Sequence, residues 1–208
     1  MKILIACEES QSVCVEMRKI GHEAYSNDII QCSGGHPEWH IVGDALKVIK
    51  SDKWDMIIAF PPCTHLSAAG APSWLKKQKD GRQQAAMKFV LDIYNSDCPM
   101  IAIENPTGWL NSHWRKPDQI IHPYQFGDPY KKRTCLWLKG LPKLQETNVV
   151  EPVAHWCSNS TRGGKLKDGT RRKSELPIRK AWDGAKERSK TFQGVAKAMA
   201  EQWGNPLK

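Results

Sequence analysis

Residues 54–64 have the sequence WDMIIAFPPCT, an apolar run that stops at two consecutive prolines and a cysteine. A short apolar segment with this ending predicts an interior strand, because proline has no N–H with which to continue the ladder. Cys63 is therefore expected where a strand passes into a loop. A second apolar run, MIAI at residues 100–103, leads directly into Glu104 and predicts a second such exit.

Both exits are expected at the same edge of an α/β sheet, where ligands bind outside the carboxyl ends of the strands. Cys63 and Glu104 would then face one crevice. This pair suits addition to a pyrimidine, in which a thiolate attacks C6 of cytosine and a carboxylic acid protonates N3. A free cysteine has a pKa near ~8.5 and needs a positive neighbour or a helix N-terminus, whereas burial keeps a glutamic acid protonated.

Each residue alone also has a simpler explanation. Cys63 fits a small buried apolar side chain in a proline-rich turn. Glu104 fits an acid at the N-terminus of a helix, where the dipole stabilises it. The two together, at the ends of two strands in this order, are more specific than either half.

Two motifs carry a resemblance to the DNA (cytosine-5) methyltransferases, in particular to their short phage or prophage-encoded members. Residues 55–67, DMIIAFPPCTHLS, resemble the nucleophile motif, and residues 103–106, IENP, resemble the glutamate motif. The resemblance implies a Rossmann-like class I fold with a mostly parallel twisted sheet flanked by helices. It also implies a SAM-dependent DNA cytosine C5-methyltransferase with Cys63 as nucleophile and Glu104 as the N3 acid.

The N-terminal segment resembles the cofactor loop of this family in an altered form. Residues 2–7, KILIAC, predict a strand, and a helical pattern follows that ends at Gly21. The family usually has glycines in the loop, because a bare backbone can approach the cofactor closely. Here EES stands at residues 8–10. The positions that the resemblance assigns to SAM, or to a SAM derivative, are Cys7, Glu8, Ser10, Asp28, Ile29, Asp44, Phe60 and Val195.

Two of these positions are aspartates with defined expectations. Asp28, in YSNDI, is similar to the acid at the end of the second strand, which accepts hydrogen bonds from the ribose hydroxyls. Asp44, in GDA, is similar to the acid that receives the adenine amino group. Asp44 also suits the N-cap of a following helix, and the two roles are compatible.

Two later segments continue the resemblance. Residues 126–138, FGDPYKKRTCLWL, resemble the basic motif and its following strand, where a cation contacts the substrate base. Lys132 and Arg133 are both candidates for this cation, and we favour Arg133; the alternative is a solvated basic turn. Residues 189–203 resemble the C-terminal motif, a helix that returns to the cofactor site with Val195 on its apolar face.

The resemblance divides the chain into a catalytic core at 1–140, a short basic recognition segment at 141–187 and a C-terminal helix at 188–208. Family members normally have a sizeable recognition domain in place of the middle segment, so we expect single-stranded or loosely specified duplex DNA as the partner. Residues 161–190 hold eleven basic and four acidic side chains, +7 of the chain's +9. This suits a loop on phosphates, with an exposed solubilising loop as the alternative. The residues assigned to nucleic acid are Lys132, Arg162, Arg171, Arg172 and Lys173.

Composition limits the remaining possibilities. A chain of 208 residues with 40% apolar content is ordinary for one globular domain with an insertion, and we expect a monomer. No apolar segment approaches eighteen residues, and the first apolar run stops too early for a signal peptide. The seven cysteines are odd in number and scattered, which favours a reducing compartment, the cytoplasm of a bacterial host or phage-infected cell.

A metal site is not expected. Cys32, His36 and His40 recur every four residues, but two glycines and a proline interrupt the helix that would align them. Three other functions stay open: a non-catalytic nucleic-acid-binding relative, a methyltransferase acting on RNA or nucleotides, and transfer of a modified group from a SAM derivative.

Overall fold

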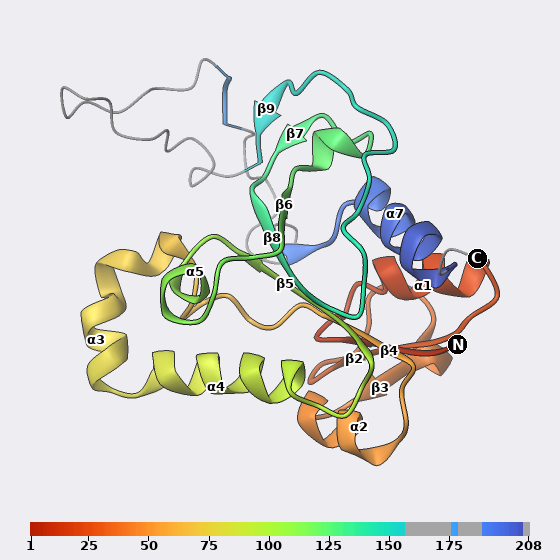
Figure 1. Cartoon of the computed structure of the whole chain (residues 1–208), viewed down its shortest axis with the longest axis horizontal. Coiled ribbons are helices and arrows are strands. Elements are labelled where there is room, and N and C mark those ends of the chain that lie inside the picture. The colour runs from red at the N-terminus through yellow and green to blue at the C-terminus, as the bar shows by residue number, and fades with distance from the viewer. Residues whose placement is uncertain (157–175, 179–188, 206–208) are drawn as a thin grey trace.

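Seven strands form one mixed sheet in the order β3-β2-β1-β4-β5-β8-β6 (Figure 1). The computed structural model describes residues 1–156, 176–178 and 189–205. The first five strands in chain order are parallel, whereas β8 runs antiparallel between β5 and β6. The strands are β1 (Lys2–Ala6), β2 (Glu23–Asp28), β3 (His40–Val42), β4 (Met56–Ala59), β5 (Met100–Pro106), β6 (Gln119–Ile121) and β8 (Thr134–Lys139). A separate pair consists of β7 (Tyr130–Lys131) and β9 (Ala154–His155).

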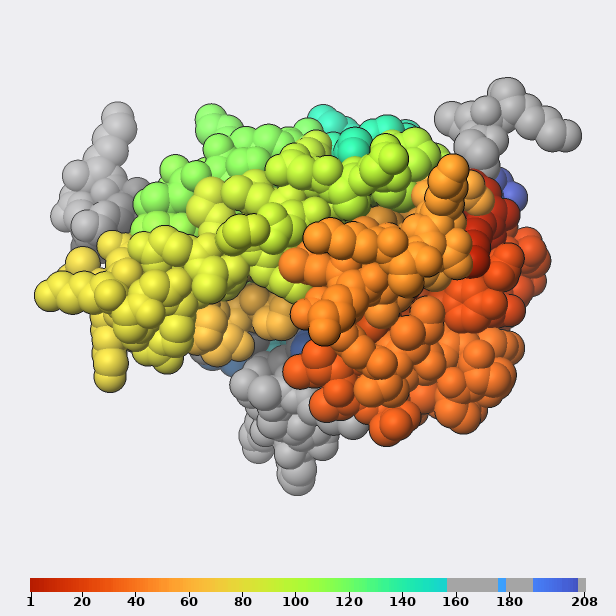
Figure 2. All heavy atoms as spheres, turned by 90° about the horizontal axis from the view of Figure 1, so that it is seen from below, coloured from red at the N-terminus to blue at the C-terminus, as the bar shows by residue number. Residues whose placement is uncertain are grey.

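Helices cover both faces of the sheet. The α-helices are α1 (Ser12–Lys19), α2 (Ala45–Ser51), α3 (Trp74–Lys79), α4 (Arg82–Tyr94), α5 (Trp109–His113) and α7 (Gln193–Gly204). Three short 3-10 segments are η1 (Pro37–Trp39), η2 (Ala68–Ser73) and η3 (Pro123–Gln125). Helices α1 and α7 lie against each other on one face, and α2, α4 and α5 lie on the other (Figure 1). Figure 2 views the molecule from the side of α2 and α4.

The alternation of side chains along each strand builds the two core layers. In β1, Ile3 and Ile5 pack under α1 and α7, whereas Leu4 faces the layer of α2 and α4. All three are fully buried. Strands covered on both faces have continuous apolar sequences rather than alternating ones. This is why the apolar runs at 2–7 and 54–60 were recognisable as interior strands.

Most predicted elements around the site are confirmed, with one difference in extent. Helix α1 ends before Gly21, which has a φ of 89°, and α7 forms as expected. Strand β5 continues to Pro106 instead of ending at residue 103, because β8 pairs with it from Lys139 opposite Ile101 to Thr134 opposite Pro106. None of the helices in the described part of the chain has the length and apolar character needed to cross a bilayer.

Candidate active site

The two candidate catalytic residues belong to neighbouring strand ends: Cys63 follows β4, and Glu104 lies within β5, two residues before its end. Strands β4 and β5 are parallel and in register, with Ala59 opposite Ile103. Cys63 comes four positions after Ala59, and Glu104 comes directly after Ile103. Because the carboxyl ends of parallel strands meet at one edge, both residues lie at the same edge of the sheet, as the sequence predicted.

Asn105 joins the two chain segments. Its amide Nδ2 donates a 2.8 Å hydrogen bond to the carbonyl oxygen of Pro61, and the residue is 1% exposed. Such a buried bond is costly to break, because the carbonyl left behind has no water to replace the donor. We call residues 60–67, between β4 and η2, the nucleophile loop. Asn105 therefore fixes the start of this loop against the strand that carries Glu104.

A second connection lies just beyond the site, at Gly108. The Ala68 N–H donates to Thr107 O at 3.0 Å, and the Trp109 N–H donates to Leu66 O at 2.6 Å. A Cβ on Gly108 would lie 2.0 Å from Leu66 O, so only glycine permits this approach. The segments that follow β4 and β5 are thus held together on both sides of the two candidate residues.

Buried side chains hold the carbonyl groups of the nucleophile loop. Cys63 O accepts from the N–H groups of Leu66 at 3.0 Å and Ser67 at 2.8 Å. The next two carbonyls accept from helices: Thr64 O from Lys77 Nζ at 2.7 Å, and His65 O from Gln83 Nε2 at 3.1 Å. Both helix residues are buried. The backbone is therefore fixed, while the Cys63 side chain is exposed.

Glu104 is in an environment that favours its protonated form. Burial raises the pKa of its carboxyl group, and the positive charge of Lys132 partly opposes this shift. A carboxylic acid that keeps its proton can donate it to a ring nitrogen. Arg133, which we favoured as the substrate cation, is exposed, and its charge lowers the pKa of His122 and opposes the burial-driven rise at Cys135. Of the two candidates, Lys132 is the cation that acts on Glu104.

An aromatic cluster lies beside Lys132. The rings of Tyr130, Trp156 and Phe192 lie with centroids 4.5–5.9 Å apart. Lys132 Nζ lies 5.7 Å from the centroid of the Phe192 ring, a cation–π distance. The three rings come from β7, from the residue after β9 and from the residue before α7. Segments far apart in the chain therefore fix the position of Lys132.

The altered cofactor loop keeps a glycine-like backbone without glycines. Cys7 has a φ of 60° and Gln11 a φ of 58°, and both lie in the left-handed region. Each such residue costs about 1–2 kcal/mol, which surrounding contacts must offset. Gln11 is fully buried; it donates to His36 O at 2.8 Å and accepts from the His36 N–H at 3.0 Å.

Glu8 has a structural task in this loop. Its carboxylate accepts from the Val13 N–H at 2.7 Å and the Cys14 N–H at 3.2 Å, which caps α1. The residue is 4% exposed, and burial raises its pKa to about 8. We assigned Glu8 to the cofactor from the sequence, but its carboxylate is turned into the protein and engaged by α1. We therefore remove Glu8 from the proposed cofactor contacts.

Cys7, Asp28 and Asp44 come together at the ends of the first strands. Burial raises the pKa of Cys7 to about 12, and the negative charges of Asp28 and Asp44 add to this shift. Asp28 Oδ1 accepts from the Ile29 N–H at 2.7 Å, and Asp44 Oδ1 caps α2 through the Leu46 N–H at 2.8 Å. The Ile29 side chain is 76% exposed. Two acids and an exposed apolar side chain fit the hydroxyls, the amino group and the ring of an adenosine.

The other assigned cofactor positions differ in exposure. Ser10 is half-buried and its Oγ lies 3.1 Å from Ser12 Oγ. Phe60 is half-buried and packs beside the core under α7, where Val195 is buried. Arg162, Arg171, Arg172 and Lys173 lie outside the described residues, so their assignment to nucleic acid stays a prediction.

The histidines of the Cys32, His36 and His40 pattern have other contacts. His36 stacks on Trp39 with ring centroids 3.9 Å apart, and His40 bonds to Ser26 Oγ at 2.8 Å. Within residues 1–156, 176–178 and 189–205, no three His, Cys, Asp or Glu side chains are grouped so as to hold a metal ion.

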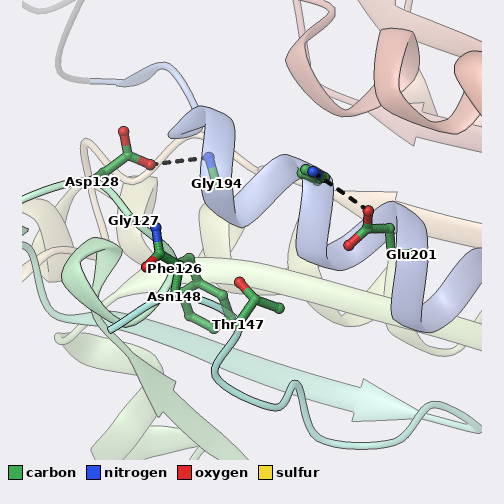
Figure 3. Close-up of a pocket in the computed structure, with 8 residues that line it drawn as sticks. Phe126, Gly127, Asp128, Thr147, Asn148, Gly194 and Glu201 are labelled. Atoms are coloured by element: carbon green, nitrogen blue, oxygen red, sulfur yellow. Dashed lines mark hydrogen bonds and ion pairs between the residues drawn. The ribbon is translucent and has the colours of Figure 1, made fainter. Parts of the chain in front are cut away.

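A polar pocket lies between α7 and the segments at 126–128 and 147–148 (Figure 3). It is lined by Phe126, Gly127, Asp128, Thr147, Asn148, Gly194, Lys197 and Glu201. Asp128 Oδ2 accepts from the Gly194 N–H at 3.0 Å, and Lys197 pairs with Glu201 at 3.7 Å. None of the candidate catalytic residues lines this pocket. The hydrogen bond between Gly194 and Asp128 anchors the first turn of α7 to the segment before β7.

The sheet order and the antiparallel β8 define the Rossmann-like fold of the class I SAM-dependent methyltransferases. The chain is similar in structure to the methyltransferase EhMeth of Entamoeba histolytica, with 15% identity and a TM-score of 0.52, over 71% of this chain and 57% of that one. It is also similar to the S. pombe Dnmt2 methyltransferase, with 13% identity and a TM-score of 0.45, over 68% of this chain and 50% of that one.

The chain thus spans about half the length of these two structures. At such low identity the likeness to EhMeth shows a shared fold and no more. A scan against protein-family models and a search of curated proteins found no match.

Proposed function

We propose that the protein is a SAM-dependent methyltransferase that acts on C5 of cytosine in DNA. The observation that carries this proposal is the connection between Cys63 and Glu104. Cys63 follows β4, Glu104 lies near the end of the adjacent parallel strand β5, and the buried bond from Asn105 to Pro61 joins their segments. A nucleophile and an acid held at one sheet edge match the two groups that addition to cytosine requires.

The residues have distinct tasks in this reaction. The Cys63 thiolate forms a bond to C6 while Glu104 gives its proton to N3, so the ring becomes nucleophilic at C5. SAM supplies the methyl group as an electrophile on a sulfonium. A water molecule then takes the C5 proton, which breaks the C–S bond and expels the Cys63 thiolate, and the N3 proton returns to Glu104. The base must leave the helix stack first, at a cost of a few kcal/mol that is smaller for single-stranded DNA.

The cofactor would be held at the ends of β1, β2 and β3. Asp28 would accept from the ribose hydroxyls, Asp44 from the adenine amino group, and Ile29 would cover the adenine ring. Cys7 and Ser10 would line the methionine end, with Phe60 and Val195 behind it. The left-handed backbone at Cys7 supports this assignment, because it brings the main chain close to the ligand where the family uses glycine.

In this proposal Lys132 is the cation that contacts the cytosine, and Arg133 does not contact the base. Lys132 acts on Glu104, and a cation there would bind the cytosine O2. The basic residues 161–190 would contact phosphates of single-stranded or loosely specified duplex DNA.

The proposal is tested by reacting DNA with labelled SAM, digesting the DNA to nucleosides and measuring the masses of the products by mass spectrometry. We expect 5-methyl-2′-deoxycytidine from the wild type and none from Cys63→Ser or Glu104→Gln, with unchanged circular dichroism and SAM binding. Cys32→Ser, a half-buried thiol in another part of the chain, is the matched control and should stay active. Full activity in Cys63→Ser would rule out the mechanism.

The same assay separates the alternatives. Product on RNA but not on DNA would indicate an RNA methyltransferase, and a mass increase other than that of a methyl group would indicate a modified donor. A protein that binds DNA without product would be a non-catalytic relative.

A further inference from the structure

Lys77 is a buried lysine beside the nucleophile loop. It lies on α3 and is 9% exposed, and its Nζ donates to the carbonyl of Thr64, the residue after Cys63, at 2.7 Å. The ammonium group lies beside Gly70, where an added Cβ would be 2.8 Å from Nζ. The absence of a side chain at Gly70 therefore leaves space for the ammonium group.

No carboxylate among the described residues pairs with the charge of Lys77. In the described part of the chain, its only hydrogen-bond partner is Thr64 O, and it takes part in no ion pair. Burying an ammonium without a counter-ion is costly. A neutral donor such as the amide of Gln83 performs the same structural task on the neighbouring carbonyl of His65. Holding a carbonyl therefore does not by itself explain a lysine here.

We propose that Lys77 is a positioning residue for the nucleophile. Its ammonium fixes the Thr64 carbonyl, and its unbalanced positive charge favours the thiolate form of Cys63. A thiolate is stabilised by a cation close to it, and the Lys77 ammonium is held on the carbonyl of the residue next to Cys63. The inference rests on the proposed function only in naming Cys63 as the nucleophile.

Other titratable groups surround the loop and must be considered. His65 lies in the loop itself, Glu104 lies on β5, and Lys132 precedes β8. Asp80, three positions after Lys77 at the C-terminal end of α3, is paired with Arg82 at 2.6 Å. None of these is changed in the variants below, so a difference between variants reports on Lys77.

The test measures the alkylation of Cys63 by iodoacetamide as a function of pH, in the full chain, with the modified peptide quantified by mass spectrometry. We expect a wild-type midpoint below the ~8.5 of a free cysteine. Lys77→Met should raise this midpoint by about one pH unit, and Lys77→Arg should keep it near the wild-type value. At pH 7, Lys77→Met should react about threefold more slowly, because tenfold less thiolate is partly offset by a more nucleophilic sulfur.

The control is Lys76→Met, which removes the same charge from an exposed position on α3. A midpoint in Lys77→Met equal to that of the wild type, or an equal shift in Lys76→Met, would overturn the proposal. Gly70→Ala is a second variant that keeps the lysine and displaces its ammonium, and it should shift the midpoint in the same direction by a smaller amount. An unchanged midpoint there would overturn the proposal if Lys77→Met does not fold.

The alkylation requires neither cofactor nor DNA. Absence of a methylated base would therefore count against the proposed function and leave this result standing, whereas an unshifted midpoint in an active enzyme would count only against the role of Lys77.

Discussion

Replacing Glu8 by glutamine should make the stability of the protein less dependent on pH. Burial holds the pKa of Glu8 at about 8 in the folded chain, against an ordinary value of 4.5. The folded state therefore binds this proton more tightly than the unfolded state. Stability from this group is fully present below about pH 4.5 and is lost as the pH rises through about 8. Glutamine keeps an acceptor for α1 but has no proton to lose.

The structure sets the size of the effect. The difference between the two pKa values corresponds to at most about 5 kcal/mol, fully lost above pH 8. The residue is 4% exposed, so solvent screening reduces this little. The pKa of about 8 already includes the effect of the N–H groups of Val13 and Cys14, which favour the charged form, so we expect a loss of up to about 5 kcal/mol.

The assay is urea unfolding followed by circular dichroism at several pH values from 5 to 9. The free energy of unfolding of the wild type should fall relative to that of Glu8→Gln as the pH rises. Glu23→Gln, on the exposed start of β2, controls for the loss of one negative charge. Glu104 and Asp128, whose pKa values are also raised by burial, are present in all three proteins and cancel. Wild-type and Glu8→Gln curves that stay parallel over this range would refute the reasoning.

Three further changes test the site. Asn105→Ala should leave Pro61 O buried without its donor, lowering stability by about 1–3 kcal/mol in urea unfolding and turnover by about a hundredfold; wild-type turnover would contradict the bridging role. Gly108→Ala places a Cβ 2.0 Å from Leu66 O and should lower stability by about 1–3 kcal/mol, so an unchanged melting temperature would be inconsistent with that contact. Neutralising Arg171, Arg172 and Lys173 together should weaken DNA binding. It should also reduce the slope of log affinity against log salt concentration by about 0.9 per lost duplex phosphate contact, and an unchanged slope would count against this role.

The secondary structure near the site could be predicted because its signals are local. The apolar run and the two prolines at 54–62 mark the end of β4, and a helical pattern with a glycine after it marks α1. The chemistry-bearing residues Cys63 and Glu104 were identified from their positions after such runs. Each of these signals lies within a few residues of the chain.

The strand order was not accessible in the same way. Strand β8 enters the sheet antiparallel between β5 and β6, and this pairing extends β5 to Pro106. The choice between Lys132 and Arg133 had the same origin, since a shift of one residue at the start of a strand moves every side chain to the other face. Only the packed sheet decides which cation acts on Glu104.

By itself, then, the sequence determined the main strands and helices around the site and placed Cys63 and Glu104 near the ends of two neighbouring strands. The tertiary structure decided the part played by Glu8, which the sequence had assigned to the cofactor. It also decided the parts played by Lys77, Gln83 and Asn105, to which the sequence had assigned no role of their own. Asn105 meets Pro61 across 44 positions, and Lys77 meets Thr64 across 13. The physical reason is that a buried polar side chain takes its function from the partner that burial gives it, and that partner is set by the folding of distant segments together.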